Sequence, residues 1–388
     1  MTPVDNNEQC SNILTFYSFR GGRGITTTLK YIAWLLVNKG LRVTVIDLNF
    51  ESPSLNTFLN DSILFKNINY FNYKENIFLD KSLSSSNINN FLEEDNFFGI
   101  IDYFYQQCFS KYINISIDKI IKTIKINKLN IEDDINSIKY IDKSISNYKN
   151  ISVFLKDLDT LQPTYINKPN QISAELNYKS CESGNLFFIP AGFFNLNYTY
   201  KLSLLSPSFI LEEFIWLDFI TQVKTLLTPD IILIDSSTGL NKWSFLSLVK
   251  ACNKSLIFLY PNEKNFKDIK QILLLLNSYQ QYQIKFIFSQ IPYLDNINLH
   301  NSNLEIKSNY LNNIENIWNA FYNTLISNDD LLKYSDYNLL PNSVSNLIID
   351  NEPIYIPYLS SIYNFDSYNI SDILKYYKSI ASYIYLNT

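Results

Sequence analysis

The residues of this chain that are best suited to chemistry lie in a glycine-rich loop near its start. The sequence has only 8 glycines in 388 residues, and three of them, Gly21, Gly22 and Gly24, fall within four positions. A chain this poor in glycine keeps it where the backbone must adopt positive φ or approach a ligand closely. An apolar run of strand length at 13–18 precedes the loop, and an amphipathic helical pattern at 29–38 follows it. This order of strand, glycine loop and helix predicts a phosphate-binding loop.

An acidic residue at the end of another apolar strand is the second candidate for chemistry. Asp235 follows four apolar residues at 231–234 and precedes a polar turn at 236–239. Sheets of α/β proteins place ligand-contacting groups at the carboxyl ends of their strands. The pattern is therefore typical of a Walker B strand, and a plain strand-end cap is the alternative reading.

Composition and charge exclude several other classes of function. The net charge is −5 and the pI is near 5.1, so no global basic field favours nucleic acid or anionic lipid. The four cysteines, Cys10, Cys108, Cys181 and Cys252, form no C-x-x-C pair, which predicts thiols in a reducing cytoplasm and no zinc site. The only histidine, His300, lies among Asn and Ser, so catalysis by histidine has no support. No apolar run reaches about 18 residues and no basic-then-apolar leader occurs, so we expect a cytoplasmic protein without a transmembrane segment.

Alternating strand and helix patterns beyond the loop predict an α/β fold with a doubly wound, mainly parallel sheet. The predicted sheet strands are 13–18, 43–46, 186–189, 231–234, 256–260 and 285–288, with a further strand at 354–358. Amphipathic helices are predicted at 209–227, 265–279 and 311–325, and a closing helix at 370–385. Residues 195–206 are predicted to continue the loop that follows 186–189. We expect helices on both faces of the sheet.

The same patterns set the expected domain boundaries. Residues 1–11 are polar and are expected to be disordered, and 12–388 are expected to form a single domain. Residues 56–150 are expected to be an irregular and helical insertion that lies mostly outside the sheet. Within it a helix is predicted to start at Gly99, and apolar residues at helical spacing predict further helix between 113 and 148.

The loop and its neighbours resemble a known family. In the MinD/ParA-type (SIMIBI-class) P-loop ATPases the loop reads K-G-G-x-G-K-[ST]-[ST], a variant of the ordinary Walker A motif. The three glycines match this pattern, Thr26 takes the Mg²⁺-ligand position, and Thr27 takes the next one. Arg20 stands where the family has its signature lysine, and Ile25 stands where it has the lysine that contacts phosphate. The chain thus carries a degenerate Walker A motif.

Two further stretches extend the resemblance. Residues 40–55 resemble the family stretch G-x-R-V-L-V-I-D-x-D-x-E-x-P-G-L, in which the second Asp helps to orient the attacking water. Asp47 keeps the first Asp of that stretch, whereas Asn49 replaces the second. Residues 232–240 resemble the family's Walker B segment. Within the family, the chain is most similar to the bacterial subgroup labelled KGGVGR-motif ATP-binding proteins.

The resemblance implies a P-loop nucleotide-binding fold that takes ATP or ADP with Mg²⁺. The implied nucleotide-binding residues are Arg20, Gly21, Gly22, Arg23, Gly24, Ile25, Thr26 and Thr27. Thr26 and Asp235 are the implied Mg²⁺ ligands, and Asp47 is the one candidate for a catalytic role. The implied partners are a second copy of the chain and an unidentified protein, with no nucleic acid evident.

Three hypotheses about function follow. The first is a nucleotide-binding switch with weak or absent hydrolysis that acts through dimerisation or a partner. The second is a working ATPase in which Arg20 or Arg23 replaces the missing lysine. The third is a pseudo-NTPase scaffold that binds no nucleotide. The loop's backbone N–H groups and the helix N-terminus still form an anion site, because they depend on glycine and geometry rather than on lysine, and this favours the first hypothesis over the third.

Overall fold

The structure of the chain is a computed structural model, and its description covers most of the expected sheet and helices. The described residues are 13–53, 65–70, 99–109, 117, 120–126, 184–212, 214–252, 254–277, 282–292, 312–323, 347–350, 352–358 and 370–386. The expected disorder of 1–11 and the residues Cys10, Cys181 and His300 lie outside them.

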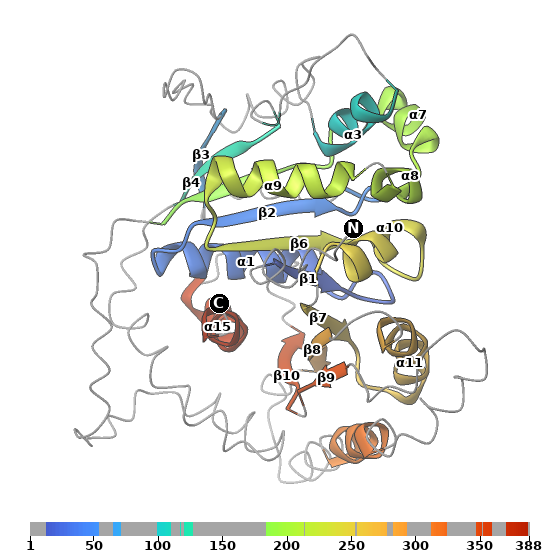
Figure 1. Cartoon of the computed structure of the whole chain (residues 1–388). Coiled ribbons are helices and arrows are strands. Elements are labelled where there is room, and N and C mark those ends of the chain that lie inside the picture. The colour runs from blue at the N-terminus through green and yellow to red at the C-terminus, as the bar shows by residue number, and fades with distance from the viewer. Residues whose placement is uncertain are drawn as a thin grey trace, which may run out of the picture.

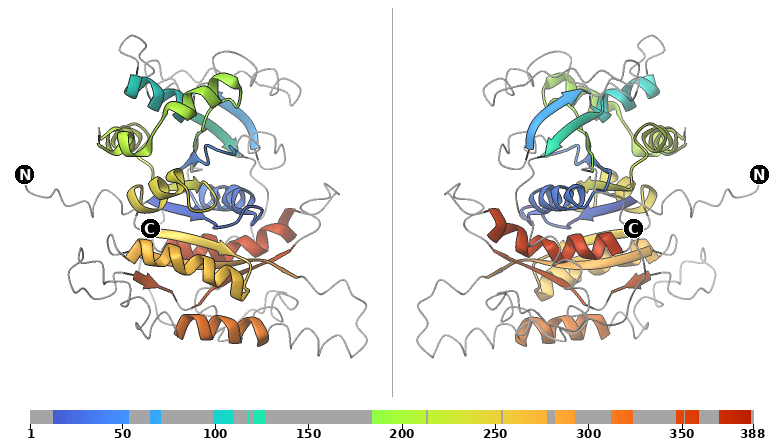
Figure 2. Two further views of the ribbon diagram at one scale, coloured as in Figure 1. Left: turned by 90° about the vertical axis from the view of Figure 1, so that its right-hand side faces the viewer. Right: turned by 90° about the vertical axis from the view of Figure 1, so that its left-hand side faces the viewer.

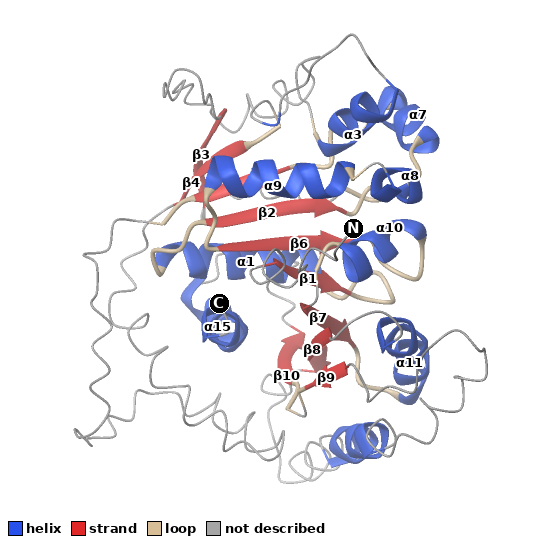
Figure 3. Cartoon of the chain, in the orientation of Figure 1, coloured by secondary structure: helices blue, strands red, loops and turns tan. Residues whose placement is uncertain are grey.

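A single sheet runs through the centre of the described residues (Figures 1 and 3). Its strands lie in the order β10-β8-β7-β1-β6-β2-β5-β4-β3, and β9 pairs with β8 beside this path. Every pairing from β10 to β5 is parallel, whereas β4 pairs antiparallel with both β5 and β3. The strand bounds are β1 Ile13–Tyr17, β2 Val43–Leu48, β3 Phe65–Tyr70, β4 Lys122–Ile126, β5 Leu186–Ile189, β6 Ile231–Ser236, β7 Lys254–Leu259, β8 Tyr282–Pro292, β9 Leu347–Ile349 and β10 Ile354–Tyr358. The predicted α/β fold with a mainly parallel sheet is confirmed.

Helices cover both faces of this sheet (Figure 2). On one face α1 (Ile25–Asn38) packs beside α15 (Ile370–Leu386), and the rings of Tyr31 and Tyr377 stack at 4.9 Å between their centroids. The opposite face carries α3 (Ile100–Phe109), α9 (Ile215–Leu227), α11 (Glu263–Asn277) and a helix at 312–323. A short α10 (Lys242–Phe245) continues into a π-helical turn, η3 (Leu246–Lys250).

Two separate buried clusters reflect the alternation of side chains along the strands. Within β1, Leu14 and Phe16 belong to the cluster beneath α1 and α15, whereas Ile13 and Tyr17 belong to the cluster beneath α9 and α11. Successive strand residues point to opposite faces, so both faces of a strand covered by helices must be apolar. This explains why the central strands appear in the sequence as continuous apolar runs rather than alternating ones.

Two predicted elements after β5 are wrong in type or extent. Residues 195–206, predicted as loop, contain helix α7 (Leu196–Leu204), because the Asn195 side chain accepts a hydrogen bond from the Tyr198 N–H at 2.8 Å and caps it. The single helix predicted at 209–227 is two helices, α8 (Pro207–Glu212) and α9. They are separated at Phe214, whose φ of 56° is left-handed and cannot continue a right-handed helix.

Two segments of the insertion predicted at 56–150 belong to the sheet. The start of α3 at the predicted place is confirmed, but β3 and β4 extend the sheet edge beyond β5. The prediction of helix is wrong for Lys122–Ile126, where pairing with β5 and the β-branched residues Thr123, Ile124 and Ile126 favour a strand. The rest of the insertion lies outside the described residues.

Gly99 lies where the start of α3 packs against the backbone that follows β5. A Cβ atom built on Gly99 would lie 2.4 Å from the backbone of Gly192, closer than real Cβ contacts come. The N–H of Ile100 donates to the Pro190 carbonyl at 2.9 Å across the same junction. The two backbones therefore touch, and only glycine fits between them.

We predict that Gly99→Ala lowers the free energy of unfolding by about 1–3 kcal/mol, the range that overpacking of a tight contact costs. Gly21→Ala is the matched control, because a Cβ at Gly21 meets no atom within 4 Å. It should change the free energy of unfolding by less than about 0.5 kcal/mol. Urea unfolding of both variants measures the difference, and equal stabilities would contradict the close approach.

Candidate functional site

The glycine loop connects the carboxyl end of β1 to the first turn of α1. Gly22 and Gly24 have φ values of 73° and 72°, in the left-handed region that favours glycine. Gly24 is the N-cap of α1, and the N–H of Thr28 donates to its carbonyl at 2.8 Å. A Cβ at Gly21, Gly22 or Gly24 would meet nothing within 4 Å, so this stretch of backbone faces open space. The loop therefore combines the N–H groups of a helix N-terminus with room for an anion.

Thr26 and Asp235, predicted to share a metal, are in contact. The Thr26 hydroxyl donates to the Asp235 carboxylate, with 3.1 Å between Oγ1 and Oδ2. Asp235 lies near the end of β6, the strand beside β1, and its side chain is 1% exposed. Burial raises the pKa of Asp235 from 3.8 to about 7, and the hydrogen bond from Thr26 opposes part of that rise. The structure thus brings a hydroxyl and a buried carboxylate together where the loop enters the first turn of α1.

Asp47 lies next to Asp235 across the pairing of two strands. The two residues are register partners of the parallel strands β2 and β6, and Asp47 is fully buried. Its Oδ1 accepts a hydrogen bond from the backbone N–H of Asn49 at 3.0 Å, which orders the chain where β2 ends. Carboxylate oxygens, such as those of Asp47 and Asp235, are ligands that Mg²⁺ prefers. A catalytic role for Asp47 stays a prediction.

Ile25 brings no cation to the loop. It is the first residue of α1, and its side chain is 7% exposed and packs with the apolar cluster beneath α1 and α15. Only its backbone can serve a ligand at the position where the family pattern has a lysine. Thr27 lies in the same first turn and is half-buried.

Both arginines of the loop are engaged by other parts of the chain. Arg20 donates from Nε to the Asp268 carboxylate of α11 at 3.0 Å, and its guanidinium forms an ion pair with the same group. Arg23 donates from a terminal nitrogen to Oε1 of Gln290 on β8 at 2.8 Å. Partial burial lowers the pKa of Arg23, and the nearby charge of Arg20 lowers it further.

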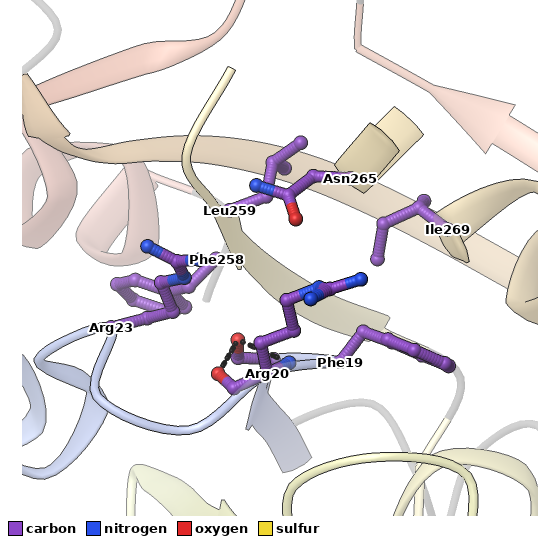
Figure 4. A pocket seen from close by; sticks show the side chains of 8 residues that line it. Phe19, Arg20, Arg23, Phe258, Leu259, Asn265 and Ile269 are labelled. Atoms are coloured by element: carbon purple, nitrogen blue, oxygen red, sulfur yellow. Dashed lines mark hydrogen bonds between the residues drawn. The ribbon is translucent and has the colours of Figure 1, made fainter. Parts of the chain in front are cut away.

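A small hollow lies between this side of the loop and the elements β7 and α11 (Figure 4). It has an empty volume of about 170 Å³ and is lined by Ser18, Phe19, Arg20, Arg23, Phe258, Leu259, Asn265 and Ile269. Figure 4 shows the two guanidinium groups pointing in different directions around it. The empty volume includes open space at the mouth of the hollow, so the enclosed part is smaller still and cannot take a whole nucleotide.

Asp268 and Gln290 are the residues that sequence reasoning missed. Asp268 lies on a helix surface among other charged residues, where a carboxylate is ordinary. Gln290 lies near the carboxyl end of β8, two residues beyond the predicted strand end at 288. The edge of the sheet could have marked Gln290 as a candidate, because carboxyl ends of parallel strands meet there.

Two absences among the described residues concern metals and membranes. No group of three or more His, Cys, Asp or Glu side chains is arranged to hold a metal ion there. No helix among the same residues is long and apolar enough to cross a membrane. The described cysteines, Cys108 and Cys252, are thiols rather than disulfides.

Comparison with known proteins finds similar structures only. No family model and no curated protein matches the chain. A pNOB8 ParA bound to nonspecific DNA is 14% identical, with a TM-score of 0.44 over 97% of this chain and 98% of its own. The MinD cell division protein of Aquifex aeolicus is 15% identical, with a TM-score of 0.43 over 95% of each chain. A Cyanothece McdA–ATP complex is 11% identical, with a TM-score of 0.43 over 96% of each chain.

These solved structures belong to the MinD/ParA family of ATPases, the group that the glycine loop resembles. At these identities and TM-scores the matches carry no argument about what this chain binds or does. What the site does in this chain depends on its own residues.

We predict that the buried Asp235 makes the ligand-free protein less stable as the pH rises. Its folded pKa, about 7, exceeds the ordinary 3.8, so the folded state binds more protons than the unfolded state between these values. The contribution of Asp235 to stability is therefore full below about pH 4, falls as the pH rises to about 7, and is constant above.

Urea unfolding of Asp235→Asn and of the parent measures this effect, because titrating groups that do not interact with Asp235 cancel in the difference. The variant should gain stability relative to the parent between about pH 5 and 7.5. Asp218 is an exposed residue of α9, so Asp218→Asn is the control and should show no such gain. A constant difference between Asp235→Asn and the parent across this range would contradict the prediction.

Proposed function

We propose that the chain is a MinD/ParA-like P-loop nucleotide-binding protein with weak or absent ATP hydrolysis. The supporting observation is the open glycine backbone at the N-terminus of α1, together with the Thr26–Asp235 hydrogen bond in the helix turn that follows it. In P-loop proteins backbone N–H groups surround the phosphates, and the loop Ser/Thr and a Walker B Asp hold Mg²⁺. The proposed ligand is ATP or ADP with Mg²⁺.

The residues present fit such a ligand in two respects. The loop glycines leave their side open, so phosphate oxygens can approach the N–H groups that the first turn of α1 leaves unpaired. The Thr26 hydroxyl and the Asp235 carboxylate would hold the metal ion, which when bound neutralises negative charge on the phosphates. Burial raises the pKa of Asp235, so this carboxyl needs a neighbouring cation to be fully ionised at neutral pH.

The chain lacks two charged groups that the resemblance assigns to hydrolysis, a lysine at position 25 and a carboxylate at position 49. Ile25 removes the cation that would stabilise charge on the β/γ-phosphates, and loss of one preorganised group of this kind costs about 10²–10³ in rate. Asn49 can hydrogen bond but has no negative charge to orient or polarise water. The two losses act on one transition state, so their effects need not multiply. We therefore infer a protein that responds to which nucleotide it holds rather than one that turns it over.

The response that we propose is self-association or binding of a protein partner. The resemblance assigns the position of Arg20 to a cation that reaches the phosphates of a second subunit, and a guanidinium can bridge two phosphate oxygens. In this structure Arg20 pairs with Asp268 instead, so that contact must open before Arg20 can reach a second copy. Although one matched ParA is bound to nonspecific DNA, the net charge of −5 favours a protein partner here.

A working ATPase is the second candidate, because two arginines lie on the loop itself. Both guanidinium groups are held by Asp268 and Gln290, and each would have to exchange partners to reach a phosphate. The scaffold that binds no nucleotide is the third candidate. Binding and turnover measurements separate all three.

We predict that Mg²⁺·ATP binds in the micromolar range or weaker, and that phosphate release stays at background. Gly21→Ala should weaken binding about tenfold while leaving stability unchanged, because its methyl group projects into the space where phosphate would lie. Isothermal titration with ATP and ADP, with and without Mg²⁺, measures the affinity, and a phosphate-release assay measures turnover.

The double variant Ile25→Lys/Asn49→Asp tests the cause of the missing turnover. Turnover in this variant alone would support the proposal. Turnover in the parent that is lost in Asp235→Ala would contradict it, and its loss in Arg20→Ala or Arg23→Ala would identify the substitute cation. A folded parent that binds neither nucleotide would favour the scaffold.

A further inference from the structure

β8 carries an irregularity beside the glycine loop. Its register with β10 pairs Phe288 with Tyr355 and Ile291 with Pro357, so three steps along β8 match two along β10. One residue of β8 is therefore extra, which defines a β-bulge. Pro357 has no N–H to donate to the ladder, which favours irregular pairing here.

Gln290 lies in this bulge and has an unfavourable backbone conformation. Its φ is 61°, in the left-handed region that residues with a Cβ atom adopt only at a cost in free energy. Bulges that need such a residue commonly use glycine. A glutamine at this position is unexplained by the strand alone, and residues held in such conformations cluster at functional sites.

The Gln290 side chain spans the gap between β8 and the loop. Its Oε1 accepts the hydrogen bond from Arg23 at 2.8 Å, and its Nε2 donates to the carbonyl of Gly22. Both polar atoms of one amide are thus bonded to two consecutive loop residues. The bulge re-aims a strand residue so that it can make both bonds at once.

The bond to Gly22 sets the direction of a whole peptide group. The Gly22 carbonyl and the Arg23 N–H belong to one planar trans peptide, so they point in opposite directions. A carbonyl held toward Gln290 therefore turns the Arg23 N–H to the other side of the loop. Gly22 has a φ of 73° and no side chain, so its own backbone does little to resist a flip of this peptide.

We propose that Gln290 is a positioning residue that fixes the Gly22–Arg23 peptide so that the loop keeps its N–H groups oriented for phosphate. This inference rests on the proposed nucleotide binding. Gln290 touches no ligand itself and acts through the loop, and its strained backbone is retained because glycine in its place would lose the side chain that makes both bonds.

The test compares Gln290→Gly and Gln290→Ala with Phe214→Gly as a matched control. Phe214 also has a non-glycine left-handed φ, 56°, at the exposed junction of α8 and α9. The full chain is titrated with Mg²⁺·ATP and with inorganic tripolyphosphate, which lacks base and ribose. Thermal unfolding and amide hydrogen exchange at residues 20–24 are measured without ligand.

Gln290→Gly should unfold at the parent's temperature or higher, since the strain is relieved, yet bind both ligands about tenfold more weakly. Exchange at residues 20–24 should quicken in both Gln290 variants. Phe214→Gly should match the parent in affinity and in loop exchange. A merely structural bulge would change the unfolding temperature alone.

Parent-like affinity and loop exchange in Gln290→Gly would overturn the inference. If the parent binds neither ligand, the proposed function fails. The hydrogen exchange then decides the inference alone, since unchanged exchange at residues 20–24 in the Gln290 variants excludes the positioning role.

Discussion

The parallel pairing of β1 with β6 is the constraint on which the rest of the site depends. It sets Phe16 beside Asp235, so the glycine loop and the buried carboxylate leave the sheet at the same edge. The helix that follows the loop then brings the Thr26 hydroxyl to that carboxylate at 3.1 Å. With an antiparallel pairing the loop and Asp235 would lie at opposite ends of the two strands.

Ile25, which stands where the family that the loop resembles has a lysine, affects the electrostatics of this edge. The apolar side chain of Ile25 packs in the core and stabilises α1 on the sheet, but it brings no cation to the loop. Arg20 and Arg23 carry positive charge nearby, yet Asp268 and Gln290 hold them toward α11 and β8. The site therefore combines an open glycine backbone with the Thr26–Asp235 hydrogen bond, whereas its two arginines are committed to contacts within the chain.

Most features with a local cause could be predicted from the sequence, α7 with its Asn195 cap being an exception, and those with a tertiary cause could not. The loop and central strands follow from glycine placement and from apolar runs buried on both faces. β4 was missed because its pairing with β5 outweighs an apolar spacing that also suits a helix. The end of α8 depends on the left-handed φ of Phe214. The contact between Gln290 and Gly22 depends on the bulge in β8 opposite Pro357. No sequence pattern marks either feature.

The central claim is that loop backbone N–H groups bind nucleotide phosphates without a lysine, and glycine NMR tests it most directly. Selective ¹⁵N-glycine labelling gives amide signals from only 8 residues, which single Gly→Ala substitutions assign. On titration with Mg²⁺·ATP the signals of Gly21, Gly22 and Gly24 should shift and saturate together, while those of Gly99 and Gly184 stay in place. Unchanged loop signals at millimolar nucleotide in the folded protein would contradict the account.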